Sequence, residues 1–181
     1  MKELSLNILD IAENSVKAGA TLTEIEISET DETLKITIRD NGCGMTEEKV
    51  AAAEDPFYTT RTTRKVGMGI PLFKMEAEMT GGSFSLTSKC REAYPDSHGT
   101  VVTAVFMKRH IDFTPLGDIV STVLTLIQGH PETDFRFLHK NAEKTVLLDT
   151  RELRNVLEDV PLNSFEVIEW IKQYLIEQYG G

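Results

Sequence analysis

Four polar side chains near the N-terminus have the types and spacing of a site for a bound cation or an activated water. Asn7, Asp10, Asn14 and Lys17 are separated by three, four and three residues, which places them on one face of a helix. Amide and carboxylate oxygens suit a hard divalent cation, and a carboxylate one turn before an amide can orient or deprotonate a water beside a phosphate. The same spacing also fits a solvated helix face, so this pattern does not decide between the two.

Two glycine-rich segments add binding chemistry. In DNGCGM (residues 40–45) the glycines allow positive φ and close approach to a flat ligand, and Asp40 can accept a hydrogen bond from an exocyclic amine. In KVGMGIPLFK (residues 65–74) glycines at a helix start leave amides and the positive dipole end free for phosphate. Pro71 has no N–H, which leaves for that contact the amides of Gly69, Ile70 and Leu72. Each segment alone also fits an ordinary tight turn.

The elements that must position these residues follow from apolar periodicity. Apolar residues at helical spacing, ended by Gly19, predict a helix over residues 3–18. Alternating apolar and polar residues predict four strands, over residues 22–28, 33–39, 83–89 and 100–107. We also expect a short helix over 46–54, capped by Thr46, and another over about 70–80.

The character of the chain changes after residue 109, and we expect residues 111–181 to form an extension. Thr114 and Pro115 favour the start of a helix running to about residue 128. A hairpin is expected next, over residues 134–139 and 144–149.

Two helices are then expected, each opened by a capping-box pattern, at Asp149 with Glu152 and at Asn163 with Glu166. The last of them, over about residues 164–178, is amphipathic, with an apolar stripe of Phe165, Ile168, Ile171 and Leu175.

Composition narrows the classes of partner. The 181 residues carry a net charge of −10, which argues against non-specific binding to nucleic acid or to an anionic membrane. The N-terminus lacks the apolar run of a signal peptide, and no stretch approaches a transmembrane length. Cys43 and Cys90 lack metal-ligand spacing and are expected to be reduced thiols. We therefore expect a cytoplasmic protein.

The order and spacing of the three motifs resemble the ATPase superfamily that joins gyrase, Hsp90, sensor histidine kinases and MutL proteins. LDIAENSVKAGA resembles the N box of that superfamily, DNGCGM the adenine-binding G1 box and VGMGI the G2 box. The resemblance spans about residues 4–107 and implies an α+β fold, a two-layer α/β sandwich of the Bergerat type. Its mixed, mainly antiparallel sheet would be covered on one face by helices, with an ATP-binding domain over 1–110 and the extension over 111–181.

The resemblance also assigns roles. It implies that Asn14 holds Mg²⁺, that Asp10 is the general base, and that Asp40 binds the adenine amino group. Further contacts with ATP are expected from Lys17, Gly42, Gly44, Met45, Gly67, Met68, Gly69, Ile70, Leu72 and Thr100. Arg64 and Lys65, with Arg61, form a basic cluster before the G2 box that fits either phosphate contact or a solvated loop.

The chain departs from the family pattern in three places. Asp10 stands where MutL proteins have a glutamate, and Pro71 stands where kinases commonly have a glycine. The N box begins almost at residue 1, so we expect no phosphoacceptor domain of a sensor kinase before it.

Three functions follow from the resemblance. The first is a kinase that transfers the γ-phosphate of ATP to a separate protein, as anti-sigma-type kinases do. The second is a MutL- or Hsp90-like ATPase that switches conformation with nucleotide, and the third is a regulatory ATP-binding module with little turnover. The extension would complete the sheet, or its last helix would bind a partner or a second copy of the chain in a homodimer.

Overall fold

Six strands pair into one mixed sheet, in the order β3-β4-β2-β1-β5-β6. This computed structural model describes residues 3–56 and 68–180. The strands are β1 (Leu22–Glu29), β2 (Thr33–Asp40), β3 (Ser83–Lys89), β4 (Gly99–Met107), β5 (Asp134–Lys140) and β6 (Thr145–Asp149). Strands β1 and β5 pair in parallel, and the other neighbouring pairs are antiparallel. The predicted mixed, mainly antiparallel sheet is confirmed.

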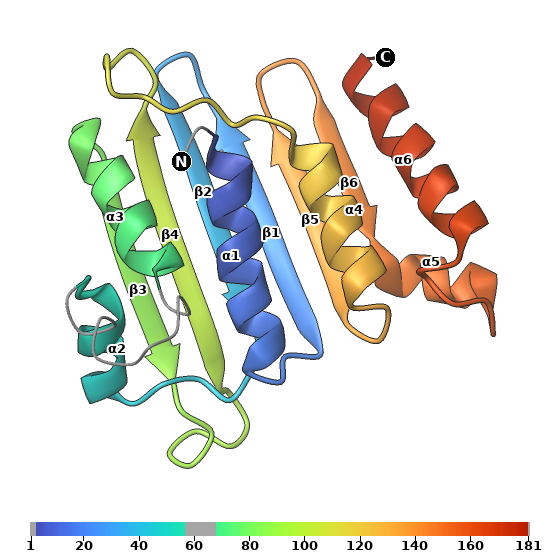
Figure 1. The fold of residues 1–181 in the computed structure, drawn as a ribbon, viewed down its shortest axis with the longest axis horizontal. Helices are drawn as coiled ribbons and strands as arrows, with labels where there is room; N and C mark the ends of the chain where they lie inside the picture. Colours follow the sequence, from blue (N-terminus) through green and yellow to red (C-terminus); the bar gives the residue numbers. More distant parts are fainter. Residues whose placement is uncertain (1–2, 57–67, 181) are drawn as a thin grey trace.

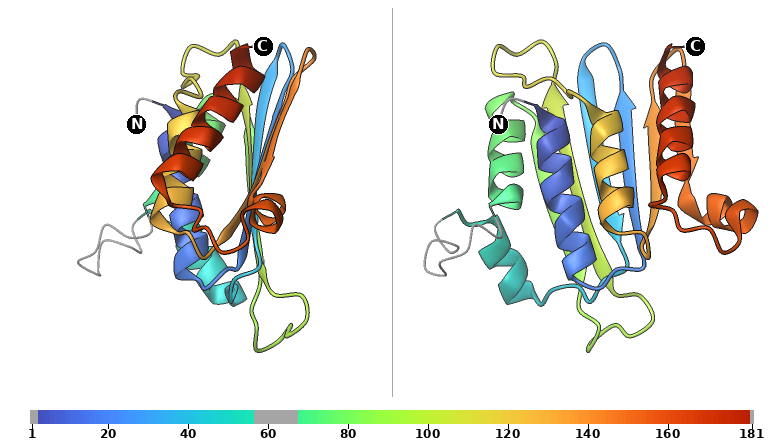
Figure 2. Two further views of the ribbon diagram at one scale, coloured as in Figure 1. Left: turned by 90° about the vertical axis from the view of Figure 1, so that its right-hand side faces the viewer. Right: turned by 45° about the vertical axis from the view of Figure 1, so that its right-hand side comes forward.

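Helices cover one face of this sheet, apart from the short helix over residues 150–157, which lies at the sheet edge on the other side (Figures 1 and 2). The helices are α1 (Leu4–Lys17), α2 (Glu47–Glu54), α3 (Gly69–Met79), α4 (Ile119–Gly129), α5 (Thr150–Leu157) and α6 (Phe165–Gly180). The strands bury alternate residues against them, such as Ile25 and Ile27 of β1, while the intervening Glu24 and Glu26 lie on the opposite face. The predicted α+β sandwich with helices on one face is therefore the observed architecture.

Helix α1 packs on the centre of the sheet through the predicted apolar stripe. Leu4 and Ile8 are fully buried, and Ile11 is nearly so. The polar face is not uniformly solvated, because Asn7 is also fully buried while Lys17 is exposed. The four polar residues of α1 therefore divide between the interior, the helix surface and solvent.

The predicted helix start at Thr114 and Pro115 is wrong. Helix α4 begins at Ile119, and Asp118 caps it by accepting from the Ser121 amide at 3.0 Å. The preceding residues instead complete α1, because the carbonyls of residues 115 and 116 accept from the amides of Leu4 and Ser5 at 2.9 and 2.8 Å. These are amides that a helix N-terminus leaves without internal partners.

Residues 111–181 add to the same sheet. Strand β5 lies beside β1, and α4 and α6 continue the helical layer across β5 and β6 (Figure 1). The predicted hairpin is confirmed as β5 and β6. At the outer edge, α6 covers β6, with Tyr174 Oη donating to the Leu147 carbonyl at 3.1 Å and Gln178 Oε1 accepting from the Leu147 amide at 3.1 Å.

The apolar stripe of α6 differs from the predicted one at its first turn. Val167, Ile171 and Leu175 are buried against the layer, whereas Phe165 is 77% exposed. Within residues 3–56 and 68–180, no helix combines the length and apolar character needed to cross a membrane.

The shared sheet predicts that the extension and the N-terminal part unfold together. Ile127 of α4 is fully buried, whereas Ile111 is 95% exposed, so the same substitution can be compared at both. Ile127→Ala should lower the free energy of unfolding by about 2–5 kcal/mol, with Ile111→Ala close to wild type. Urea unfolding followed by circular dichroism and by Trp170 fluorescence should give one coincident transition. Two separate transitions would contradict a shared core.

Candidate functional site

The end of β2 and the C-terminal half of α1 are joined through one carboxylate. Asp40 Oδ2 accepts from the Ser15 hydroxyl of α1 at 2.7 Å, and Asp40 Oδ1 accepts from the Gly42 amide at 2.9 Å. Each oxygen keeps a further lone pair, since a carboxylate has about four acceptor positions. Asp40 is thus fixed in orientation and can accept another donor.

The turn after β2 depends on its glycines. Gly44 has φ +69°, and a Cβ there would lie 1.9 Å from the Lys89 carbonyl oxygen. A Cβ on Gly42 would lie 2.9 Å from Cβ of Ala18, at the end of α1. The turn is also tied to that helix end, because the Cys43 amide donates to the Ala18 carbonyl at 2.9 Å. The glycines therefore let the turn pack tightly between α1 and β3.

A cavity of about 700 Å³ opens between α1, α2, the start of α3 and the sheet. Three predicted polar or turn residues line it, Asn14, Asp40 and Thr100. Gly44, Met45 and Ile70, for which contact with ATP was predicted, also line it. Asp40 and Thr100 are directly opposite each other on the paired strands β2 and β4. One end of the cavity thus has a fixed carboxylate beside a hydroxyl.

The start of α3 lies against α1. Gly69 is buried, and a Cβ there would lie 3.1 Å from Cβ of Asp10, so this residue allows the two helices to approach. Pro71 has no amide hydrogen, and the Leu72 amide already donates to the Met68 carbonyl at 3.1 Å. The prediction of a free Leu72 amide is therefore wrong, because helix pairing begins there. The amides of Gly69 and Ile70 remain the ones that a helix start leaves unpaired.

Asp10 has a perturbed acidity. Partial burial raises the pKa of its carboxyl above the ordinary 3.8, Lys17 lowers it and Glu13 raises it further. Asp10 lies next to Gly69 rather than among the residues that line the cavity. Asp10 remains exposed to solvent, and its raised pKa makes it a better proton acceptor than an aspartate with the ordinary value.

Asn14 is the residue whose position best suits a cation. It lines the cavity one turn after Asp10, and its side-chain amide oxygen is a suitable ligand for a hard cation. In the part of the chain that the structure describes, no group of three or more His, Cys, Asp or Glu residues could hold a metal ion.

Several predicted residues are placed elsewhere. Gly42 supports Asp40, Met68 is the N-cap residue of α3, and Lys17 is exposed without lining the cavity. Arg61, Arg64, Lys65 and Gly67 lie outside the described residues.

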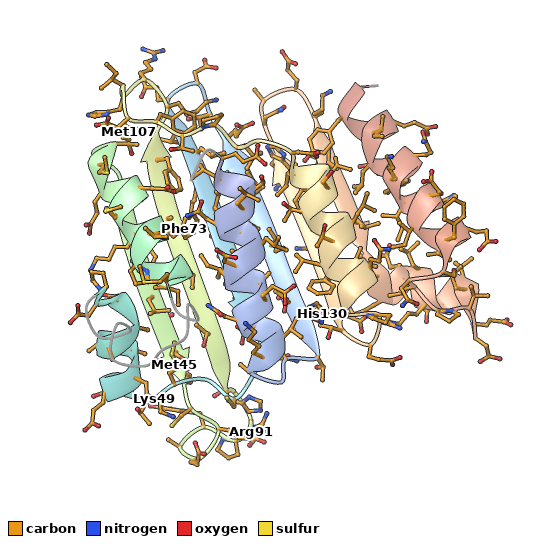
Figure 3. All side chains as sticks on the ribbon, in the orientation of Figure 1. Met45, Lys49, Phe73, Arg91, Met107 and His130 are labelled. Atoms are coloured by element: carbon orange, nitrogen blue, oxygen red, sulfur yellow. The ribbon has the colours of Figure 1, made fainter. Side chains whose placement is uncertain are left out.

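The sequence did not reveal the contribution of α2 or of Ser15. Lys49 and Glu48 of α2 line the cavity, as do Ala52 and Ala53, and Figure 3 shows Lys49 on α2 near Met45. The positively charged side chain of Lys49 therefore lies at the cavity wall. The sequence of α2 has no nucleotide-binding motif that could have indicated this position. Ser15 occupies an apolar-stripe position, and only the folded arrangement brings its hydroxyl to Asp40.

Comparison with known proteins agrees with this arrangement. Residues 2–110 match the family described as histidine kinase-, DNA gyrase B- and HSP90-like ATPase. The DNA mismatch repair protein MutL of Listeria monocytogenes (strain F2365) is 26% identical over 182 residues, which cover 83% of this chain and 30% of that protein. The tetrathionate sensor histidine kinase TtrS of Salmonella typhimurium is 32% identical over 100 residues, which cover 55% of this chain and 16% of that protein.

Solved structures share the fold. The Aquifex aeolicus MutL ATPase domain complexed with ADP matches with a TM-score of 0.55 at 16% identity, covering 87% of this chain and 70% of that one. The N-terminal domain of a DNA repair protein matches with a TM-score of 0.58 at 15% identity, covering 82% and 53%. The chain belongs to the histidine kinase-, gyrase B- and HSP90-like ATPase family, and it spans less than a third of the length of these curated relatives.

The acidity of Asp10 predicts a stability effect with a defined sign. Because burial favours the protonated form, ionisation of Asp10 destabilises the fold once the pH exceeds the unfolded value of 3.8. Asp10→Asn should therefore raise the free energy of unfolding at pH 7, and the gain should shrink as the pH falls toward 4. Urea unfolding across that range measures it, with Asp96→Asn in an exposed loop as the control. A destabilised Asp10→Asn at pH 7 would contradict the assignment.

Proposed function

We propose that the cavity binds ATP and that the chain transfers the γ-phosphate to a separate protein. The observation that carries the proposal is the cavity itself, which is lined by the oriented carboxylate, by Asn14 and by Ile70 at the start of α3, while Asp10 lies beside Gly69 outside that lining. Membership of an ATPase family supports ATP as the ligand.

The base would bind at the Asp40 end. The carboxylate accepts from the exocyclic amine of adenine, while Ile38, Met45 and Val102 supply an apolar surface for the ring. Because Ser15 and Gly42 already hold Asp40, the carboxylate needs no reorganisation on binding.

The phosphates would extend toward α3, where the amides of Gly69 and Ile70 lie in the first turn, at the positive end of the helix. Lys49 adds a cation from the cavity wall, and Arg64 and Lys65 are further candidates on the segment before Gly67. Asn14 would ligate Mg²⁺, which when bound neutralises charge on the phosphates.

Asp10 would accept the proton of the attacking nucleophile. In the transfer, the bond between the γ-phosphorus and the oxygen bridging to the β-phosphate breaks, and ADP leaves with its electron pair. A new bond forms from the acceptor side chain to the γ-phosphorus, and the acceptor proton moves to the Asp10 carboxylate. The raised pKa of Asp10 favours this role.

The histidines of this chain support an acceptor on another protein. His98 contacts the Gly42 carbonyl at 2.5 Å, and His130 contacts Glu13 at 2.8 Å. His139 is buried between Tyr179 and Glu29, at 2.7 and 3.1 Å. His110 Nδ1 accepts from the Asp112 amide at 3.1 Å at the surface. All four are already bonded within the fold, so a free phosphoacceptor histidine is better sought in trans.

A second candidate is a MutL-like ATPase that changes conformation with nucleotide. The alignment with Listeria MutL covers 83% of this chain and so includes part of the extension, which favours this function. Hydrolysis would then replace transfer, with a water in place of the protein acceptor and phosphate released.

Incubation with γ-labelled ATP and Mg²⁺ separates these functions. We expect label on a second protein when extract from the source cells is added, and we expect Asp10→Asn and Asn14→Ala to lower it at least tenfold because base and cation ligand are lost. The exposed loop variant Asp96→Asn is the control and should label like wild type.

Released phosphate without protein label would contradict transfer and favour the MutL-like function. No label and no phosphate, with ATP still bound, would leave a regulatory module that binds without turnover.

A further inference from the structure

A serine outside the cavity joins three groups that surround it. Ser88 Oγ, on β3, accepts from the Met45 amide at 2.7 Å. The same oxygen lies 3.1 Å from the Gly99 carbonyl and 2.8 Å from Oγ1 of Thr100. Ser88 and Thr100 are directly opposite on paired strands, and both side chains point to the helical face.

The available protons fix the direction of these bonds. A serine hydroxyl donates once and accepts twice. The Gly99 carbonyl can only accept, so it takes the Ser88 proton, and the Met45 amide fills one acceptor position. Thr100 must then donate its proton to Ser88 for all three contacts to be hydrogen bonds. In this arrangement Oγ1 of Thr100 presents only lone pairs to the cavity.

The result is a wall of acceptors at the base end of the cavity. Asp40 is opposite Thr100 in the sheet register, and residues so paired have Cβ atoms about 4.5–5.5 Å apart on one face. A ligand group that donates two hydrogen bonds, such as an exocyclic amine, fits between them. A base without that amine offers no donor to the remaining lone pairs of Asp40 and Thr100, which then lose the hydrogen bonds that the amine would supply.

We propose that Ser88 is a positioning residue for base recognition, which keeps Thr100 as an acceptor beside Asp40 and so favours bases that carry an exocyclic amine. This inference rests on the proposed binding of ATP in the same cavity. Ser88 itself does not line the cavity, and it acts through Thr100 and through the turn at Met45.

A purely structural role for Ser88 makes a different prediction. If Ser88 only held the turn at Met45, its loss would weaken the binding of all nucleotides equally. If it also orients Thr100, its loss frees the threonine hydroxyl to rotate and donate, and the effect depends on the amine. The preference for ADP over purine riboside diphosphate, which lacks the 6-amino group, is therefore the decisive readout.

Calorimetric affinities of both nucleotides test the proposal in wild type, Ser88→Ala and Ser85→Ala. Ser85 is an exposed serine on the opposite face of the same strand and is the matched control. We expect Ser88→Ala to lower the affinity for ADP roughly three- to tenfold. The affinity for the amine-free analogue should change less than about twofold. Ser85→Ala should match wild type, and Ser88→Thr, which keeps the hydroxyl, should keep the preference.

Thr100→Val gives a second test that does not depend on how Ser88→Ala folds. Thr100→Val should lower the preference for ADP over the amine-free analogue. The double variant with Ser88→Ala should lower that preference no further, because both residues act through one hydroxyl. The inference would be overturned if the variants lost the same affinity for both nucleotides, or if both single variants kept the wild-type preference for ADP. Either result would leave ATP binding intact. Wild type that binds neither nucleotide would overturn the proposed function as well.

Discussion

The carboxylate of Asp40 joins the helix that carries the candidate catalytic residues to the turn that ends β2. Its two oxygens accept from Ser15 of α1 and from the Gly42 amide, so both elements must be in place for either bond to form. The turn gains a second tie through the Cys43 amide and the Ala18 carbonyl at 2.9 Å. This part of the cavity is therefore held in place by tertiary contacts, which lowers the ordering cost of binding a ligand there.

The same helix is held at its other end by the extension. Carbonyls of residues 115 and 116 accept from the first amides of α1, and His130, just after α4, contacts Glu13 on the side of α1 (Figure 3). Strand β5 meanwhile pairs with β1, so β1 is not an edge strand. Although none of the described residues 111–180 lines the cavity, this extension supports the helix that carries Asp10 and Asn14.

The sequence predicted the strands and the tight turn after β2 well, because alternation and glycine placement are local signals. Gly44 shows this, since its positive φ follows from the turn motif alone. Contacts that join distant segments could not be predicted in this way. Ser88 lies 43 residues after Met45, and Asn7 is buried on a face that reads as polar. The Thr114–Pro115 signal is typical of a helix start, yet the carbonyls of Pro115 and Leu116 instead accept from the first amides of α1.

The central claim is that the Asp40 carboxylate accepts a hydrogen bond from the exocyclic amine of a bound adenine nucleotide. Calorimetric titration with ADP tests this claim most directly. Wild type should bind, and Asp40→Asn should bind roughly 10- to 100-fold more weakly, as expected for loss of a hydrogen bond to a charged group. Circular dichroism should confirm that the variant stays folded. ADP affinity unchanged in a folded Asp40→Asn protein, or no binding by wild type, would contradict the account.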